Sequence, residues 1–160
     1  MERVQEAIKD ILETYLNTEL VARESIAGYP TVTLPEPASY WLNFHDRTVI
    51  SANQYPAVIL LPGDTRVEEA QVYGYKLNYY HSLAIVVLLQ HRDLETLQRM
   101  RVRYAEAIIA ALKKHQKEHN MLPCEIREVS YDRVFRDEEN APYLSSVWVM
   151  VEVREQVTLS

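Results

Sequence analysis

The chain has 160 residues, of which 48% are hydrophobic and 25% are charged, and it contains only 3 glycines. This length predicts one domain, residues 1–160, that buries about two-thirds of the surface exposed by the unfolded chain, and the composition excludes a disordered acidic tail. The formal charge of -6, from 23 acidic and 17 basic residues, argues against a general nucleic-acid binder, because neutralising phosphates requires a basic surface.

Apolar periodicity predicts an N-terminal amphipathic helix that ends before Gly28. Its stripe recurs every three or four positions and comprises Val4, Ala7, Ile8, Ile11, Leu12, Tyr15 and Leu16. Four prolines between Pro30 and Pro56 favour a short strand or an extended connection in that region over a helix. Residues 57–61 are then expected to form a buried strand that ends at residues 62–64, Pro-Gly-Asp.

The middle of the chain predicts a long strand followed by a second helix. Residues 65–74 are polar and acidic and are expected to form a hairpin connection or an edge strand, and residues 77–89 are rich in Leu, Tyr, Ile and Val, as a buried strand requires. Asp93 is expected to cap the helix, since its carboxylate can accept a backbone N–H bond. The apolar stripe comprises Leu94, Leu97, Arg101, Tyr104, Ile108, Ala111, Leu112 and His115.

Two further strands, residues 125–136 and 143–157, are predicted after Pro123 and are joined by the acidic turn 137–142. In the second strand, four alternate valines from 147 to 153 mark a core face. The expected fold class is therefore α+β: an antiparallel sheet of about four strands packed against two amphipathic helices, in the order helix-strand-strand-helix-strand-strand.

The sequence predicts a soluble protein that is cytosolic at synthesis. Cys124 is the only cysteine, so no intrachain disulfide is possible and a reducing compartment is expected. The N-terminus opens an amphipathic helix instead of a secretion signal. The longest apolar run, residues 83–89, is far shorter than the ~20 residues of a membrane helix, so no membrane partner is expected.

No arrangement of residues indicates an enzyme. Three glycines, none in a cluster, cannot form a phosphate-binding loop, and no Gly-x-Ser-x-Gly motif is present. His115 and His119 could share a metal ion on one helix face, but no second pair of ligands accompanies them. A metal-dependent nuclease could use carboxylates with a lysine, and the candidates are Asp64, Glu68, Glu69, Asp132, Glu152 and Lys76. Their spacing does not force them together, so we expect no catalytic, cofactor-binding or metal-binding residues.

The tyrosines are more suggestive, since the chain has 11 Tyr and only 2 Phe. Tyr supplies a large contact area with a polar tip and is enriched at protein interfaces, although a half-buried sheet face whose hydroxyls reach water explains these tyrosines equally well. The residues predicted to contact other subunits or partners are Arg66, Glu68, Glu69, Tyr73, Tyr75, Tyr79, Asp137, Glu138 and Glu139.

The order of elements and several hydrophobic runs resemble the tail terminator, or tail-completion, proteins of long-tailed bacteriophages. The resemblance rests on the N-terminal helix and on residues 55–60, 83–87, 93–97 with 103–108, and 147–153. It spans nearly the whole chain as a pattern of elements and does not rest on a diagnostic motif.

The resemblance implies a non-enzymatic virion protein of the tail and neck that needs no cofactor and is assembled in the host cytoplasm. Its subunits would close into a ring, expected to be a hexamer, on the end of the tail tube. Its partners would be further copies of itself, the tail tube protein and a head-completion or connector protein. DNA would pass through the lumen without specific binding, which agrees with the acidic charge.

Three alternatives remain open on the sequence. The chain could be another neck component such as a head-completion adaptor, which would bind the portal instead of the tail tube. It could be a small metal-dependent nuclease, which would require divalent metal and one of the named carboxylates. It could also be a bacterial protein that shares only the fold, because a fold does not determine a function.

Overall fold

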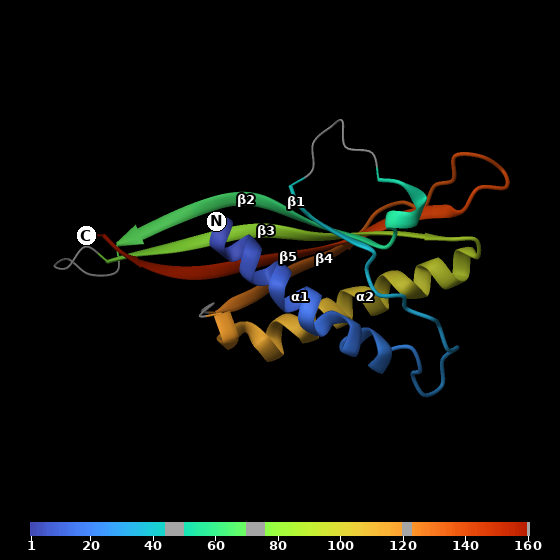
Figure 1. The fold of residues 1–160 in the computed structure, drawn as a ribbon, viewed down its shortest axis with the longest axis horizontal. Helices are drawn as coiled ribbons and strands as arrows, with labels where there is room; N and C mark the ends of the chain where they lie inside the picture. The colour runs from blue at the N-terminus through green and yellow to red at the C-terminus, as the bar shows by residue number, and fades with distance from the viewer. Residues whose placement is uncertain (44–49, 70–75, 120–122, 160) are drawn as a thin grey trace.

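The computed structural model describes residues 1–43, 50–69, 76–119 and 123–159. The chain forms one five-stranded sheet with two helices packed on the same face of it (Figure 1). The α+β class and the helical layer on one side are therefore confirmed.

The first helix, α1 (Glu2–Ala22), buries the stripe that the sequence predicts, and Ile8, Ile11 and Leu12 are fully buried. The second helix, α2 (Leu94–His115), is followed by a 3-10 turn, η2 (Gln116–His119). Asp93 caps α2 as expected, because its carboxylate accepts the backbone N–H of Thr96 at 2.9 Å. The Thr96 hydroxyl also donates to this carboxylate, and the two hydrogen bonds lower the pKa of Asp93.

The strands are β1 (Ser39–Leu42), β2 (Ala57–Glu69), β3 (Lys76–His91), β4 (Cys124–Tyr131) and β5 (Tyr143–Thr158), and a short 3-10 turn, η1 (Ala52–Gln54), precedes β2. Their order in the sheet is β1-β2-β3-β5-β4. The sheet thus has five strands where about four are predicted, because the proline-rich connection supplies β1. It is mixed and not purely antiparallel, because β1 pairs in parallel with β2 while the other neighbours are antiparallel.

The prediction that the first buried strand ends at residues 62–64 is wrong. β2 continues through Pro62 to Glu69, with a shift in its pairing to β3 between Pro62 and Thr65. Proline is tolerated there because β1 ends opposite Leu60, so that within the described residues β2 is the edge strand from this point on. Glycine is required at position 63, since a Cβ would lie 2.9 Å from the carbonyl oxygen of Ser82.

The main core lies between the sheet and the helices, and Leu60, Ile85 and Val149 from the sheet pack there with Tyr104 and Ile108 from α2. A smaller apolar cluster covers part of the opposite sheet face. Its buried members are Ile59, Ala84 and Val86, and Trp41 and Trp148 are among the partly buried side chains around them. The helix face predicted from the periodicity is correct for Ile108 but not for Leu94, which is 38% exposed at the first turn of α2.

Arg103 fixes the long connection between α1 and β1 to α2. Its side chain is 4% exposed, and it donates to the carbonyl oxygens of Glu24 and Pro30, each at 2.7 Å, and to that of Arg23 at 3.2 Å. The adjacent Tyr104 hydroxyl donates to the carbonyl of Pro35. Arg103 therefore does not belong to a basic surface patch, because a buried cation must be satisfied by nearby acceptors.

Candidate assembly interface

Beyond the helices, the sheet narrows to three strands that project from the body of the subunit (Figure 1). We call this projection the arm and define it as residues 65–69 of β2, 76–81 of β3 and 154–158 of β5. On one side, β1 ends opposite Leu60, and on the other, β4 begins opposite Val153. Among the described residues, neither outer edge of the arm is paired with another strand.

One side of the arm is polar throughout, whereas the other carries the arm's apolar residues Val67, Leu77 and Val157, together with Tyr79 and four polar residues. We call this second side the apolar side. Side chains alternate between the two faces along a strand. Leu83 and Ile85 of β3 belong to the main core, so the odd-numbered residues of β3 and their partners on β2 and β5 point to the helix side. On the arm this side carries Thr65, Val67, Glu69, Leu77, Tyr79, His81, Glu155 and Val157. Because the helices do not reach the outer part of the arm (Figure 1), Val67 is 51% exposed.

The polar side is held by contacts that run across the strands. The guanidinium of Arg66 lies 4.5 Å from the ring centre of Tyr80 and pairs with Glu68 at 3.0 Å. Asn78 is 8% exposed, and its side-chain oxygen accepts hydrogen bonds from Arg154 at 3.2 Å and from Gln156 at 3.4 Å. The three strands of the arm are thus cross-linked by side chains as well as by the backbone ladder.

His81 lies at the base of the arm and is 3% exposed. Its Nδ1 is 2.9 Å from the Thr65 hydroxyl, and its Nε2 is 2.9 Å from the Glu155 carboxylate. Arg3 of α1 lies 4.0 Å from the same carboxylate, and the ring of Tyr79 stacks on that of His81. The chain of contacts from the Thr65 hydroxyl through the His81 imidazole to the Glu155 carboxylate resembles the arrangement in some hydrolases. The imidazole is buried within the sheet, however, and its contacts join the arm to the body.

The structure places the predicted interface residues in two groups. Arg66, Glu68 and Glu69 are exposed on β2 of the arm, and Tyr79 is half-buried on its apolar side. Asp137, Glu138 and Glu139 are exposed in the loop between β4 and β5, at the opposite end of the sheet (Figure 1). Tyr73 and Tyr75 lie outside the described residues. The two groups therefore cannot form one contact surface on a single copy.

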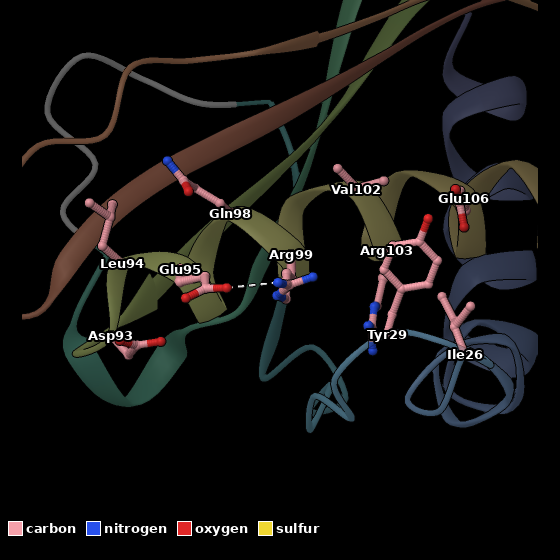
Figure 2. A pocket seen from close by; sticks show the side chains of 10 residues that line it. All are labelled: Ile26, Tyr29, Asp93, Leu94, Glu95, Gln98, Arg99, Val102, Arg103 and Glu106. Carbon is pink, nitrogen blue, oxygen red and sulfur yellow. Dashed lines mark hydrogen bonds and ion pairs between the residues drawn. The ribbon is translucent and has the colours of Figure 1, made fainter.

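A groove of about 1100 Å³ lies between α2 and the connection that follows α1 (Figure 2). Four large apolar side chains line it and are 36–64% exposed: Ile26, Tyr29, Leu94 and Val102. Asp93, Glu95, Arg99 and Glu106 contribute charge to it, and Arg99 pairs with Glu95 at 2.7 Å. The sequence did not indicate this groove, because Ile26 and Tyr29 are loop residues and Val102 lies outside the apolar stripe of its helix.

A smaller cavity of about 170 Å³ lies at the end of the sheet opposite the arm and is lined in part by Tyr55, Asp132 and Phe135. The Asp132 carboxylate accepts the indole N–H of Trp148 at 2.8 Å and a hydrogen bond from Ser146. Burial raises the pKa of the Tyr55 hydroxyl, and the charge of Asp137 raises it further. The Asp132 carboxylate is thus occupied in local hydrogen bonds.

The carboxylates considered for a nuclease are not brought together. Asp132 is bound to Trp148, whereas Glu152 pairs with Arg127 at 2.6 Å, and Glu68 lies on the arm. Within the described ranges, no three His, Cys, Asp or Glu side chains are grouped as metal ligands would be.

His115 is the last residue of α2, and Cys124 is the first residue of β4. His115 stacks on Tyr15 with 3.5 Å between the ring centres and contacts Glu118 at 2.8 Å. Cys124 is fully buried, and burial raises the pKa of its thiol to about 11. Such a thiol is almost entirely protonated at neutral pH and is a poor nucleophile.

In the described part of the chain, neither helix has a segment of the length and hydropathy that crossing a membrane requires.

Comparison with known proteins gives limited information. No family model matches the sequence, and no curated protein matches it. Among solved structures, a chain of "Virion of native gene transfer agent (GTA) particle" is similar, with 14% sequence identity and a TM-score of 0.33. The alignment covers 93% of this chain and 98% of that chain. This likeness is too weak to assign a family or a function to the protein.

Proposed function

We propose that the protein is a structural virion component whose copies assemble into a ring that caps the phage tail tube. The ring would end polymerisation of the tail and present a surface for joining the head. The observation that carries this proposal is the arm, whose two outer edges pair with no other strand among the described residues and whose apolar side leaves Val67 51% exposed. Unpaired edges are templates for pairing with another chain, and a small sheet needs its apolar side covered to be stable.

The position of the arm supports assembly into a ring. The arm and the acidic loop that contains Asp137 lie at opposite ends of the sheet (Figure 1). A contact between different surfaces of adjacent copies is heterologous, and it closes into a ring when the rotation between copies divides the full circle. The two outer edges of the arm are a pair of different surfaces of this kind, because one belongs to β2 and the other to β5.

The charge of the chain supports a lumen through which DNA slides. The net charge of -6 opposes retention of phosphates. The resemblance of the sequence to tail terminator proteins supports the more specific role, with the tail tube protein on one side of the ring and a head-completion or connector protein on the other.

Light scattering of the purified protein, alone and after addition of tail tubes, tests the proposal. We expect a particle whose mass is a multiple of 18.7 kDa, six-fold for a hexamer, either before or after contact with tubes, and tubes that no longer lengthen. A protein that stays at the mass of one subunit and leaves tube growth unaffected would contradict the proposal. Binding to the portal and not to tubes would instead identify a head-completion adaptor.

A further inference from the structure

We infer that the arms of adjacent copies join edge to edge, with β2 of one copy parallel to β5 of the next. This inference rests on the proposed ring and adds to it the partner surface of each edge. The result would be one continuous sheet passing from copy to copy, with the polar sides of all arms facing the same way.

The strand directions determine which edges can meet in a ring. β2 and β5 both lie next to β3 and both run antiparallel to it, so they run in the same direction as each other. Rotation about a ring axis repeats the order of strands from copy to copy, so it sets β2 beside the β5 of a neighbour in parallel. A two-fold axis would instead place β2 against β2, or β5 against β5, in antiparallel orientation.

The two edges match in length and in availability. Residues 65–69 form the β2 edge of the arm and residues 154–158 form the β5 edge, so each extends roughly 17 Å. The Arg154 N–H reaches the carbonyl of Pro123 at 3.4 Å, and beyond it no described strand pairs with the outer edge of β5. Pairing of these edges would satisfy backbone groups on both copies.

The apolar side of the arm favours the same contact. Val67 on the β2 edge and Val157 on the β5 edge both point to the helix side. When the two edges join, these side chains become neighbours on one face of the continuous sheet and lose part of their exposure to water. The contact therefore accounts for an apolar side that extends past the helices of its own subunit.

Cysteine cross-linking tests the inference directly, because the native Cys124 is fully buried and does not compete. Three double variants would combine Glu68→Cys with Arg154→Cys, Gln156→Cys or Thr158→Cys, all on the polar side of the arm, so that three registers are sampled. Under mild oxidation of the assembled protein we expect at least one of them to form a ladder of covalent multimers up to the size of the ring. Adjacent strands bring Cα atoms within the 4.4–6.8 Å that a disulfide requires.

The control variants distinguish this contact from others. Glu68→Cys alone is expected to remain monomeric on a non-reducing gel, and a covalent dimer would indicate a two-fold β2–β2 contact and overturn the inference. Glu68→Cys with Glu106→Cys on α2 is expected to give no ladder. A ladder from that pair alone would place the arm against the helices of a neighbour, which would also overturn it.

Light scattering of the same variants separates the two proposals. A particle of full ring mass with no ladder in any of the three edge variants would overturn the edge pairing and leave the ring standing. A single-subunit mass with and without tail tubes, already in the unmodified protein, would overturn the ring and with it the edge pairing.

Discussion

Individual buried polar side chains connect segments that are far apart in this sequence. Arg103 holds three carbonyl groups of the connection after α1, and His81 joins β2 to β5 through Thr65 and Glu155. Each such group would be costly if left unpaired, because burial removes its hydration. These residues therefore specify how the segments are arranged as well as stabilising them.

Replacement of Arg103 with Met is expected to lower the free energy of unfolding by roughly 2–3 kcal/mol, because carbonyl groups that it satisfies would lose a charged donor. Equilibrium unfolding in urea would measure the change. Arg99→Met is the matched control, since Arg99 pairs with an exposed Glu95, and exposed ion pairs contribute less than about 1 kcal/mol. Equal losses in the two variants would contradict the structural role assigned to Arg103.

Glu19 predicts a dependence of stability on pH. Burial raises the pKa of its carboxyl, but hydrogen bonds from Lys114 and Arg23 outweigh this effect, so the pKa lies below its ordinary value of 4.5. A carboxyl with a lowered pKa in the folded state stabilises the protein above the unfolded-state pKa and loses that contribution as the pH falls through the folded-state pKa. We expect Glu19→Gln to weaken the fall in stability below pH 4.5, as measured by urea unfolding across the acid range. An unchanged profile would show that these hydrogen bonds do not lower the pKa.

At the scale of elements, the helices follow their sequence pattern closely and the strands follow it less closely. The apolar stripe of α1, that of α2 apart from Leu94, and the Asp93 cap are confirmed, because they depend on residues three or four positions apart. The length of β2 was underestimated, because Pro62 and Gly63 suggested an end. Whether a proline ends a strand depends on the neighbouring strand, and here β1 has already ended.

Two substitutions on α2 test which face it buries. Ile108→Asp is expected to unfold the subunit, with a loss of more than about 4 kcal/mol, because the charge would lie in the core without a partner. Val102→Asp, at a position that is 44% exposed on the same helix, is expected to leave the protein folded. Far-UV circular dichroism and urea unfolding would distinguish them, and a folded Ile108→Asp variant would show that the assigned face is wrong.

At the scale of the whole molecule, the predicted contact residues separate into an arm and a distant loop. Arg66, Glu68 and Glu69, which the sequence predicts as contact residues, are exposed, because charged residues in a short polar segment are rarely buried. It could not indicate that the arm projects beyond the helices, because this depends on where β1 and β4 end relative to β5. The groove beside α2 was missed because it forms where the loop residues Ile26 and Tyr29 meet Val102, which lies outside the apolar stripe of α2.

Tyr79→Ala is expected to weaken assembly by about tenfold or more while leaving the far-UV circular dichroism unchanged, because large aromatic side chains dominate the energetics of interfaces. Sedimentation or light scattering over a range of protein concentrations would measure the change. Tyr29→Ala, in the groove and 64% exposed, is a control that should not affect assembly through the arm. A Tyr79→Ala subunit that loses its secondary structure would assign Tyr79 to the fold and not to the contact.

The sequence by itself determined the two helices, the segments that form most of the strands and the α+β class, because local periodicity and capping depend on near neighbours along the chain. The tertiary structure decided which strand edges remain open, which side of the arm lacks a cover and which polar groups become buried. These properties depend on which distant segments meet in space, as when Arg103 reaches Pro30 or when β4 begins opposite Val153. The surfaces proposed for assembly belong to this second set, because an edge is open only relative to the strands that surround it.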